Sequence, residues 1–129
     1  MNAAGVARVV SLLTIAFGVF ALARPEQMAH FANLQPLNGD GWSDIAALYG
    51  GMPIVIGLVG LQAARKSSTE GPVVLIVLGL LWFGFPAGRI VAVWTTPLGP
   101  GTVSYANVAL EVCAGSLLCW SGWKLGYQR

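Results

Sequence analysis

Long apolar stretches alternate with short polar ones along this chain, and this pattern predicts helices that cross a membrane. Four stretches are mostly apolar and roughly 20 residues long, which is the length that an α-helix needs to span a bilayer. They cover about residues 5–23, 44–64, 72–94 and 105–125. Strands of a membrane barrel are shorter and alternate in polarity, so only helices fit. The sequence therefore predicts an all-α fold: a single domain over residues 1–129, built as a four-helix transmembrane bundle with short loops.

The first apolar stretch also has features of a secretory signal peptide. Arg8 lies near its start, and Ala21, Leu22 and Ala23 form a small-residue motif of the kind that signal peptidase cleaves. The apolar stretch is long for a signal peptide, however. We therefore expect it to be retained as the first span.

The longest connection between spans, residues 24–43, carries a second amphipathic pattern. Pro25 suits the first turn of a helix. Met28, Phe31 and Leu34 recur every three residues and would form one apolar stripe. This pattern predicts a short interfacial helix after the first span. The simpler interpretation is that it caps the end of the bundle, and the alternative is that it docks a partner or a lipid.

The positive charges predict how the spans are oriented. With four crossings, Arg24 is the one clear loop cation on its side, and the opposite side holds Arg8, Arg65, Lys66, Lys124 and Arg129. Loops rich in lysine and arginine stay in the cytoplasm. The sequence thus predicts a multi-pass membrane protein with both termini cytoplasmic.

Composition agrees with a lipid environment and excludes several classes of partner. Charged residues make up 9% of the chain and hydrophobic ones 56%, whereas a soluble domain has about 25% charged residues. The net charge is +2, and no basic run or zinc-finger spacing is present. We therefore expect no nucleic-acid partner. The expected partners are the lipid bilayer and either other membrane protein subunits or further copies of the chain.

Candidate catalytic and metal-binding residues are sparse. Cys113 and Cys119 are six positions apart, which is about 9 Å along a helix and too far for a disulfide within it. His30 is the only histidine, and no P-loop, Rossmann glycine motif, nucleophile elbow or HExxH motif is present. The sequence predicts no catalytic residue, no metal site and no cofactor, which favours a nonenzymatic role.

The ionisable residues within the spans are the informative ones, because a charge at mid-membrane costs about 2.5–3.5 kcal/mol and normally has a partner. Arg89 and Glu111 lie at similar depths, about 8 Å and 10 Å from the outer ends of consecutive antiparallel spans. Asp44 begins the second span on the same side, where it either caps its own helix or bonds Arg89. Tyr49 lies at least one turn deeper. We predict an outer-facing polar cluster of Asp44, Tyr49, Arg89 and Glu111. It either fixes helix register or forms a pocket for a ligand or protons.

Small residues and prolines predict local features of the second and third spans. Gly84 and Gly88 form a GxxxG motif, and Ala47 and Gly51 have the same spacing, which lets helices approach closely. Prolines interrupt the backbone hydrogen bonding of both spans and predict kinks, at Pro53 and Pro86. Trp82, deep in the third span, is expected to pack.

Several of these residues also indicate a family. The first span ends in Arg24-Pro25-Glu26, Asp44 leads into Tyr49-Gly50-Gly51, and Gly88-Arg89 and Glu111 follow in the third and fourth spans. In these features the chain resembles the small bacterial four-helix membrane proteins described as Domain of Unknown Function 4345. The resemblance implies the same fold in the inner membrane of a bacterium. It also emphasises the same polar residues, without implying a reaction. Members often have an arginine after the acidic residue, where this chain has Ile45, so Arg89 is the expected partner for the acids.

These observations leave three functional hypotheses. Short loops and the sparse catalytic chemistry favour a nonenzymatic accessory subunit or interaction protein of a membrane complex. The polar cluster supports an alternative, the binding or transport of a small lipid-soluble ligand. A membrane enzyme that uses Glu111 or Asp44 as acid or base is the weakest hypothesis, because carboxylates alone supply no nucleophile or metal.

Overall fold

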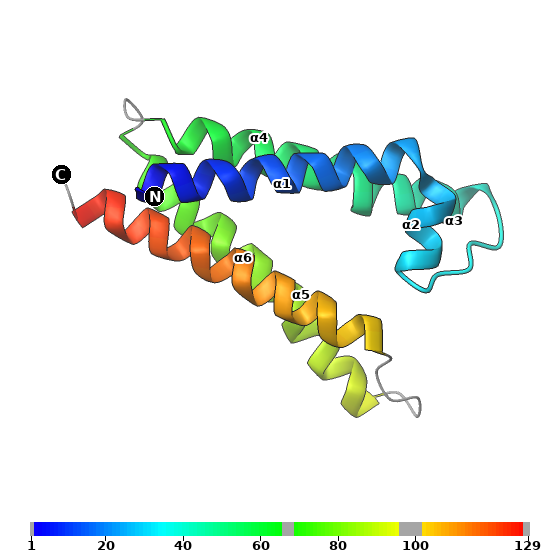
Figure 1. Ribbon diagram of the computed structural model, residues 1–129. Helices are drawn as coiled ribbons and strands as arrows, with labels where there is room; N and C mark the ends of the chain where they lie inside the picture. The colour runs from blue at the N-terminus through cyan, green and yellow to red at the C-terminus, as the bar shows by residue number, and fades with distance from the viewer. Residues whose placement is uncertain (1, 66–68, 96–101, 128–129) are drawn as a thin grey trace.

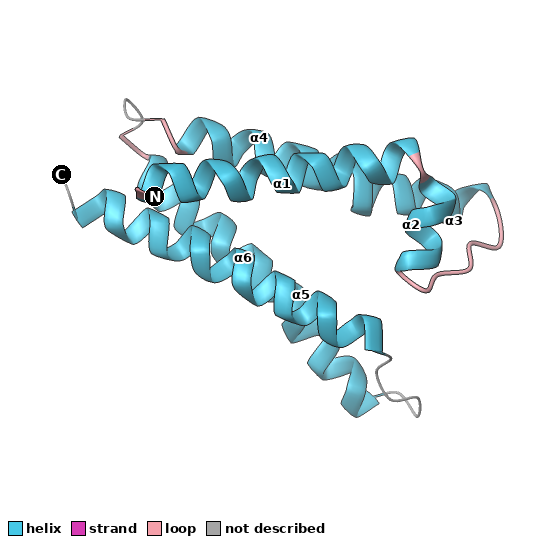
Figure 2. Ribbon diagram, viewed as in Figure 1, coloured by secondary structure: helices cyan, strands magenta, loops and turns pink. Residues whose placement is uncertain are grey.

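The chain is helical throughout the part that the structure describes. The computed structural model describes residues 2–65, 69–95 and 102–127, and side chains outside 92–104. Figure 2 shows helices joined by loops. In chain order they are α1 (Ala3–Ala23), α2 (Pro25–Phe31), α3 (Gly39–Ile45), the π-helix η1 (Ala46–Gly51), α4 (Met52–Ala63), α5 (Gly71–Thr95) and α6 (Thr102–Tyr127). The predicted all-α fold is confirmed over these residues.

The second predicted span begins earlier than expected. One continuous helical stretch runs from Gly39 to Ala63 through α3, η1 and α4. Its start is fixed by Asn38, whose side-chain oxygen accepts a hydrogen bond of 3.1 Å from the backbone N–H of Gly41. The prediction that this helix begins at Asp44, with Asp44 as its cap, is therefore wrong. The segment that starts at Gly39 resembles a loop in the sequence, but it forms the first turn of the helix.

Three helical stretches are long and apolar enough to cross a membrane: Ala3–Ala23, Gly39–Ala63 and Gly71–Val91. These stretches indicate a membrane protein. The helix α6 is long as well, with 26 residues, but polar residues lower its mean hydropathy, among them Asn107, Glu111, Ser121 and Lys124.

The helices pack as two antiparallel pairs, α1 with η1 and α4, and α5 with α6 (Figure 1). Small residues line each contact. A Cβ atom at Gly57 would lie 2.6 Å from the Ser11 carbonyl oxygen, and one at Gly79 would lie 2.7 Å from that of Gly115. The paired backbones therefore touch where no side chain fits. We call these two contacts the glycine seams: Ser11, Gly18, Gly50 and Gly57 in one pair, and Pro72, Gly79, Gly115 and Gly122 in the other.

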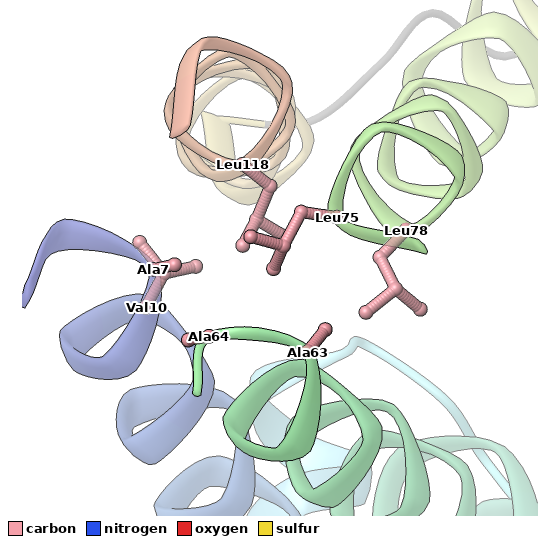
Figure 3. Packing of buried hydrophobic residues seen from close by; sticks show 7 residues of the cluster. All are labelled: Ala7, Val10, Ala63, Ala64, Leu75, Leu78 and Leu118. Carbon is pink, nitrogen blue, oxygen red and sulfur yellow. The ribbon is translucent and has the colours of Figure 1, made fainter. Parts of the chain in front are cut away.

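The two pairs meet at one end of the molecule and diverge toward the other (Figure 1). They meet near the start of α1 and the end of α6, around a cluster of seven buried apolar residues that we call the junction core (Figure 3). It consists of Ala7, Val10, Ala63, Ala64, Leu75, Leu78 and Leu118. Residues from both helix pairs contribute to the junction core, so it holds the pairs together. Because it lies at one end of the molecule, it does so at that end.

The helix α2 caps the diverging end of the first pair. Met28, with 1% of its surface exposed, packs with Ala21 and Ile45, and Tyr49 lies against the same cluster. The predicted helix after the first span is thus present. Its apolar residues do not form one stripe, however, because Phe31 is 45% exposed while Met28 is buried.

Candidate functional site

The glycine seam between α5 and α6 sets the register that brings Arg89 to Glu111. Gly79 faces Gly115 and Pro72 faces Gly122, so on backbone register alone Glu111 lies opposite a residue that precedes Arg89 by about two turns. Helical side chains lean toward the N-terminus of their own helix. In an antiparallel pair, two such side chains lean toward one another, and this closes the gap.

Arg89 and Glu111 form an ion pair between the two helices. Nη1 of Arg89 donates to both carboxylate oxygens of Glu111, at 2.5 Å each. The Glu111 side chain is 11% exposed and that of Arg89 is 31% exposed. In surroundings of low dielectric constant, an ion pair with this geometry offsets much of the cost of removing both charges from water. The predicted contact between these two residues is confirmed.

Asp44 and Tyr49 lie on the other helix pair. Asp44 is exposed in the last turn of α3, and Tyr49 is half-buried in η1. No hydrogen bond or ion pair between described side chains joins either residue to Arg89 or Glu111. The divergence of the pairs toward this end accounts for the separation (Figure 1). Of the four predicted cluster residues, the structure brings together two.

Pro53 coincides with a change of helix type. The chain forms the π-helix η1 immediately before it, and the N–H of Met52 donates to the carbonyl of Ala47, five residues earlier. Proline removes a backbone donor and crowds the preceding turn, and a wider turn accommodates both effects. The predicted disruption at Pro53 thus takes the form of a π-turn that contains Tyr49, whereas α5 continues through Pro86.

The sequence predicts only a packing role for Trp82, but its side chain also brings a polar N–H group into the interior. Its indole Nε1 is buried without an acceptor among the described residues, as is the hydroxyl of Ser121. Trp82 lies seven residues before Arg89, which places both on the same face of α5. That spacing was the available signal. It puts a second donor on the same face of α5, about two turns before Arg89.

The described cysteine, histidine and acidic side chains do not gather into a metal site. Within residues 2–65, 69–95 and 102–127, no three of them lie close enough together to hold an ion. The acid of the ion pair, Glu111, is bound to Arg89 instead. The arrangement supplies two donors, one paired carboxylate and an apolar setting, which suits binding better than bond cleavage.

Comparison with known proteins adds a family but no activity. No curated protein and no solved structure matches the chain. A family model does match, over residues 3–121, and it includes all four predicted cluster residues. The chain belongs to the family described as Domain of unknown function (DUF4345).

Proposed function

We propose that the chain is a nonenzymatic protein of the bacterial inner membrane, a bundle of four transmembrane helices that serves as an accessory subunit or interaction protein. The helix α6 is the fourth span in this proposal. At 26 residues it is about 39 Å long, enough to cross the hydrocarbon core. Its buried carboxylate, Glu111, is neutralised by Arg89, which lowers the cost of placing it in lipid.

The observation that carries the interaction role is the exposed face of α5. A Cβ atom at Gly84 or Gly88 would meet nothing within 4 Å. By contrast, glycines of the seams, such as Gly79 and Gly115, pack against the backbone of the facing helix. Glycines four residues apart let a further helix approach closely. The exposed pair is thus suited to contact another membrane helix, from a partner subunit or from a second copy.

Replacing both Gly84 and Gly88 with leucine is expected to abolish association without unfolding the protein. Bulk at these positions meets open space within the chain but would hold another helix away. The measurement is native gel analysis of protein purified from its own membranes in mild detergent. We expect an association constant at least tenfold lower, which corresponds to about 1.4 kcal/mol.

The matched control is Gly39→Leu, because a Cβ at Gly39 also meets nothing within 4 Å but lies outside α5. It should leave association unchanged. A wild-type protein that is purely monomeric, or a double variant that associates as well as wild type, would rule out this role for α5.

Orientation gives a separate test of the four-span proposal. The start of α1 and the end of α6 lie at the same end of the molecule (Figure 1), as an even number of crossings requires. With Cys113 and Cys119 replaced by serine, a cysteine at Leu37 should react with an impermeant maleimide in intact cells. Cysteines at Asn2 and Tyr127 should react only after the membrane is permeabilised. Labelling of Asn2 and Tyr127 from opposite faces would contradict the proposal.

A second candidate function is the binding of a small lipid-soluble ligand. The observation that favours it is the pair of donors on one face of α5: the buried Nε1 of Trp82 and the partly exposed guanidinium of Arg89. Trp82 also packs against the junction core, so this face of α5 is turned toward the first helix pair. This candidate involves a different face of α5 from Gly84 and Gly88, so the two functions can be tested independently.

A further inference from the structure

The unpaired N–H of Trp82 is the starting point for identifying the ligand class. An indole N–H can only donate a hydrogen bond, and Nε1 of Trp82 is buried with no acceptor among the residues that the structure describes. A buried donor without an acceptor is costly, and such groups are rare in folded proteins. In a membrane-spanning helix, bulk water is not at hand to supply the acceptor.

Trp82 sits where the junction core ends. It packs against that core, as do Ile56 of α4 and Ala114 of α6. Its ring also contacts Phe85 edge-on, with ring centroids 5.9 Å apart. These neighbours are apolar, and a buried water needs two to four polar partners. An apolar molecule that carries its own acceptor therefore suits this position better than water.

Arg89 supplies a second donor farther along the same face. Seven residues of helix separate it from Trp82, a rise of about 10 Å. Its hydrogen bonds to Glu111 both start at Nη1, and a guanidinium has five N–H groups in all. Pro86 lies between the two donors on this face, and it is buried. The face thus presents two donor side chains with an apolar interval.

The charge of the ion pair selects for a neutral ligand. Glu111 already balances Arg89, so an anion would add an uncompensated charge in surroundings of low dielectric constant. A flat ring with carbonyl oxygens at opposite ends has the required features. With a hydrogen bond of about 2.9 Å at each end, it bridges a distance of the same order as the two helical turns between the donors.

We propose that this face of α5 binds a quinone-type molecule dissolved in the bilayer, one of whose carbonyl oxygens accepts from Nε1 of Trp82 and the other from Arg89. The proposal rests on the second candidate function and names its ligand class. No redox step is required of the protein.

The test uses the full-length protein in nanodiscs and a decyl-substituted benzoquinone as the probe, with affinity measured by calorimetry. Trp82→Phe keeps one aromatic ring but removes the donor together with part of the indole, and we expect it to bind about tenfold more weakly. Its melting temperature without the quinone measures the lost packing, and the dimethoxybenzene below tests the hydrogen bonds without changing the protein. Trp123→Phe is the control, because Trp123 is exposed near the end of α6, away from this face, and it should bind as wild type does. A dimethoxybenzene with the same tail should bind wild type at least tenfold more weakly than the quinone.

The outcomes separate the ligand class from the binding function. Equal affinity of wild type and Trp82→Phe for the quinone, or equal affinity of wild type for the quinone and the dimethoxybenzene, would overturn the proposal. Solvent extraction of protein purified from its own membranes supplies the second readout. A co-purified molecule without carbonyl groups whose retention depends on Arg89 would overturn the quinone proposal and retain the binding function. No co-purified molecule and no quinone binding would overturn both.

Discussion

Replacing Glu111 with glutamine is expected to lower the free energy of unfolding by about 3 kcal/mol, near the lower end of the range for breaking a buried ion pair. Glutamine has the same shape but no charge, so Arg89 would keep its positive charge in a half-buried site without a counterion. The cost comes from this unpaired charge more than from the lost hydrogen bonds. The measurement is reversible unfolding in mixed detergent micelles.

The double variant Arg89→Met/Glu111→Leu shows whether the two residues act as a pair. Apolar residues of similar volume remove both charges together, so much of the stability should return. If the destabilisations caused by Arg89→Met and Glu111→Leu simply add in the double variant, the contact is energetically unimportant. Glu26→Gln is the control for loss of a carboxylate, because Glu26 is exposed on α2, and it should change stability by less than about 0.5 kcal/mol.

The Arg89–Glu111 pair was predictable because the sequence indicates both the depth of each residue in the membrane and which helices are neighbours. Two consecutive helices joined by a short loop must be antiparallel neighbours, and residues at equal distance from that loop lie at equal depth. Charges in a span also need partners. These rules place Arg89 and Glu111 on neighbouring helices near the same end, and the lean of the two side chains toward one another closes the remaining offset of about two turns.

Asp44 and Tyr49 fall outside these rules. Asp44 and Tyr49 were predicted near the same outer face of the membrane as Arg89. Being near the same face does not fix the distance between two helices that are not joined by a short loop. That distance depends on where the two pairs touch, which is the junction core around residues such as Leu75 and Ala63. Because this core lies at the opposite end, the pairs diverge before they reach Asp44 (Figure 1).

The start of the second span was missed for a local reason. Gly39 and Gly41 lower helix propensity, so the sequence there resembles a loop. The Asn38 side chain satisfies one of the free N–H groups of the first turn, and this tips the balance toward helix. Whether a side chain caps a helix depends on the local backbone geometry, which the composition of the segment does not reveal.

Within the chain, the close helix contacts lie at other glycines than the predicted GxxxG pair. Gly84 and Gly88 have the expected spacing of four residues but face away from the rest of the chain. The seams use a spacing of seven instead, as in Gly115 and Gly122, which keeps small residues on one side of a long helix contact. Spacing identifies a helix face, but only the fold determines whether that face meets another helix.

The second large effect is expected at Gly79, where alanine should destabilise the protein by about 1–3 kcal/mol, the usual cost of overpacking. The added Cβ would lie 2.7 Å from the Gly115 carbonyl oxygen and 2.9 Å from the backbone nitrogen of Cys119. Backbone atoms of a helix cannot rotate away as a side chain can, so α5 and α6 must separate. Because the same seam sets the register of Arg89 and Glu111, separation would also lengthen the ion pair.

Gly84→Ala is the matched control, since it lies on the same helix and a Cβ there meets nothing within 4 Å. Alanine favours helix over glycine by up to about 1 kcal/mol, so this variant should be as stable as wild type or more stable. The two substitutions are chemically identical, so the difference in stability between the two variants measures the contact at Gly79. Equal stability of the two variants in detergent unfolding would mean that the α5–α6 backbones do not touch at Gly79. The register that brings Arg89 to Glu111 would then need another cause.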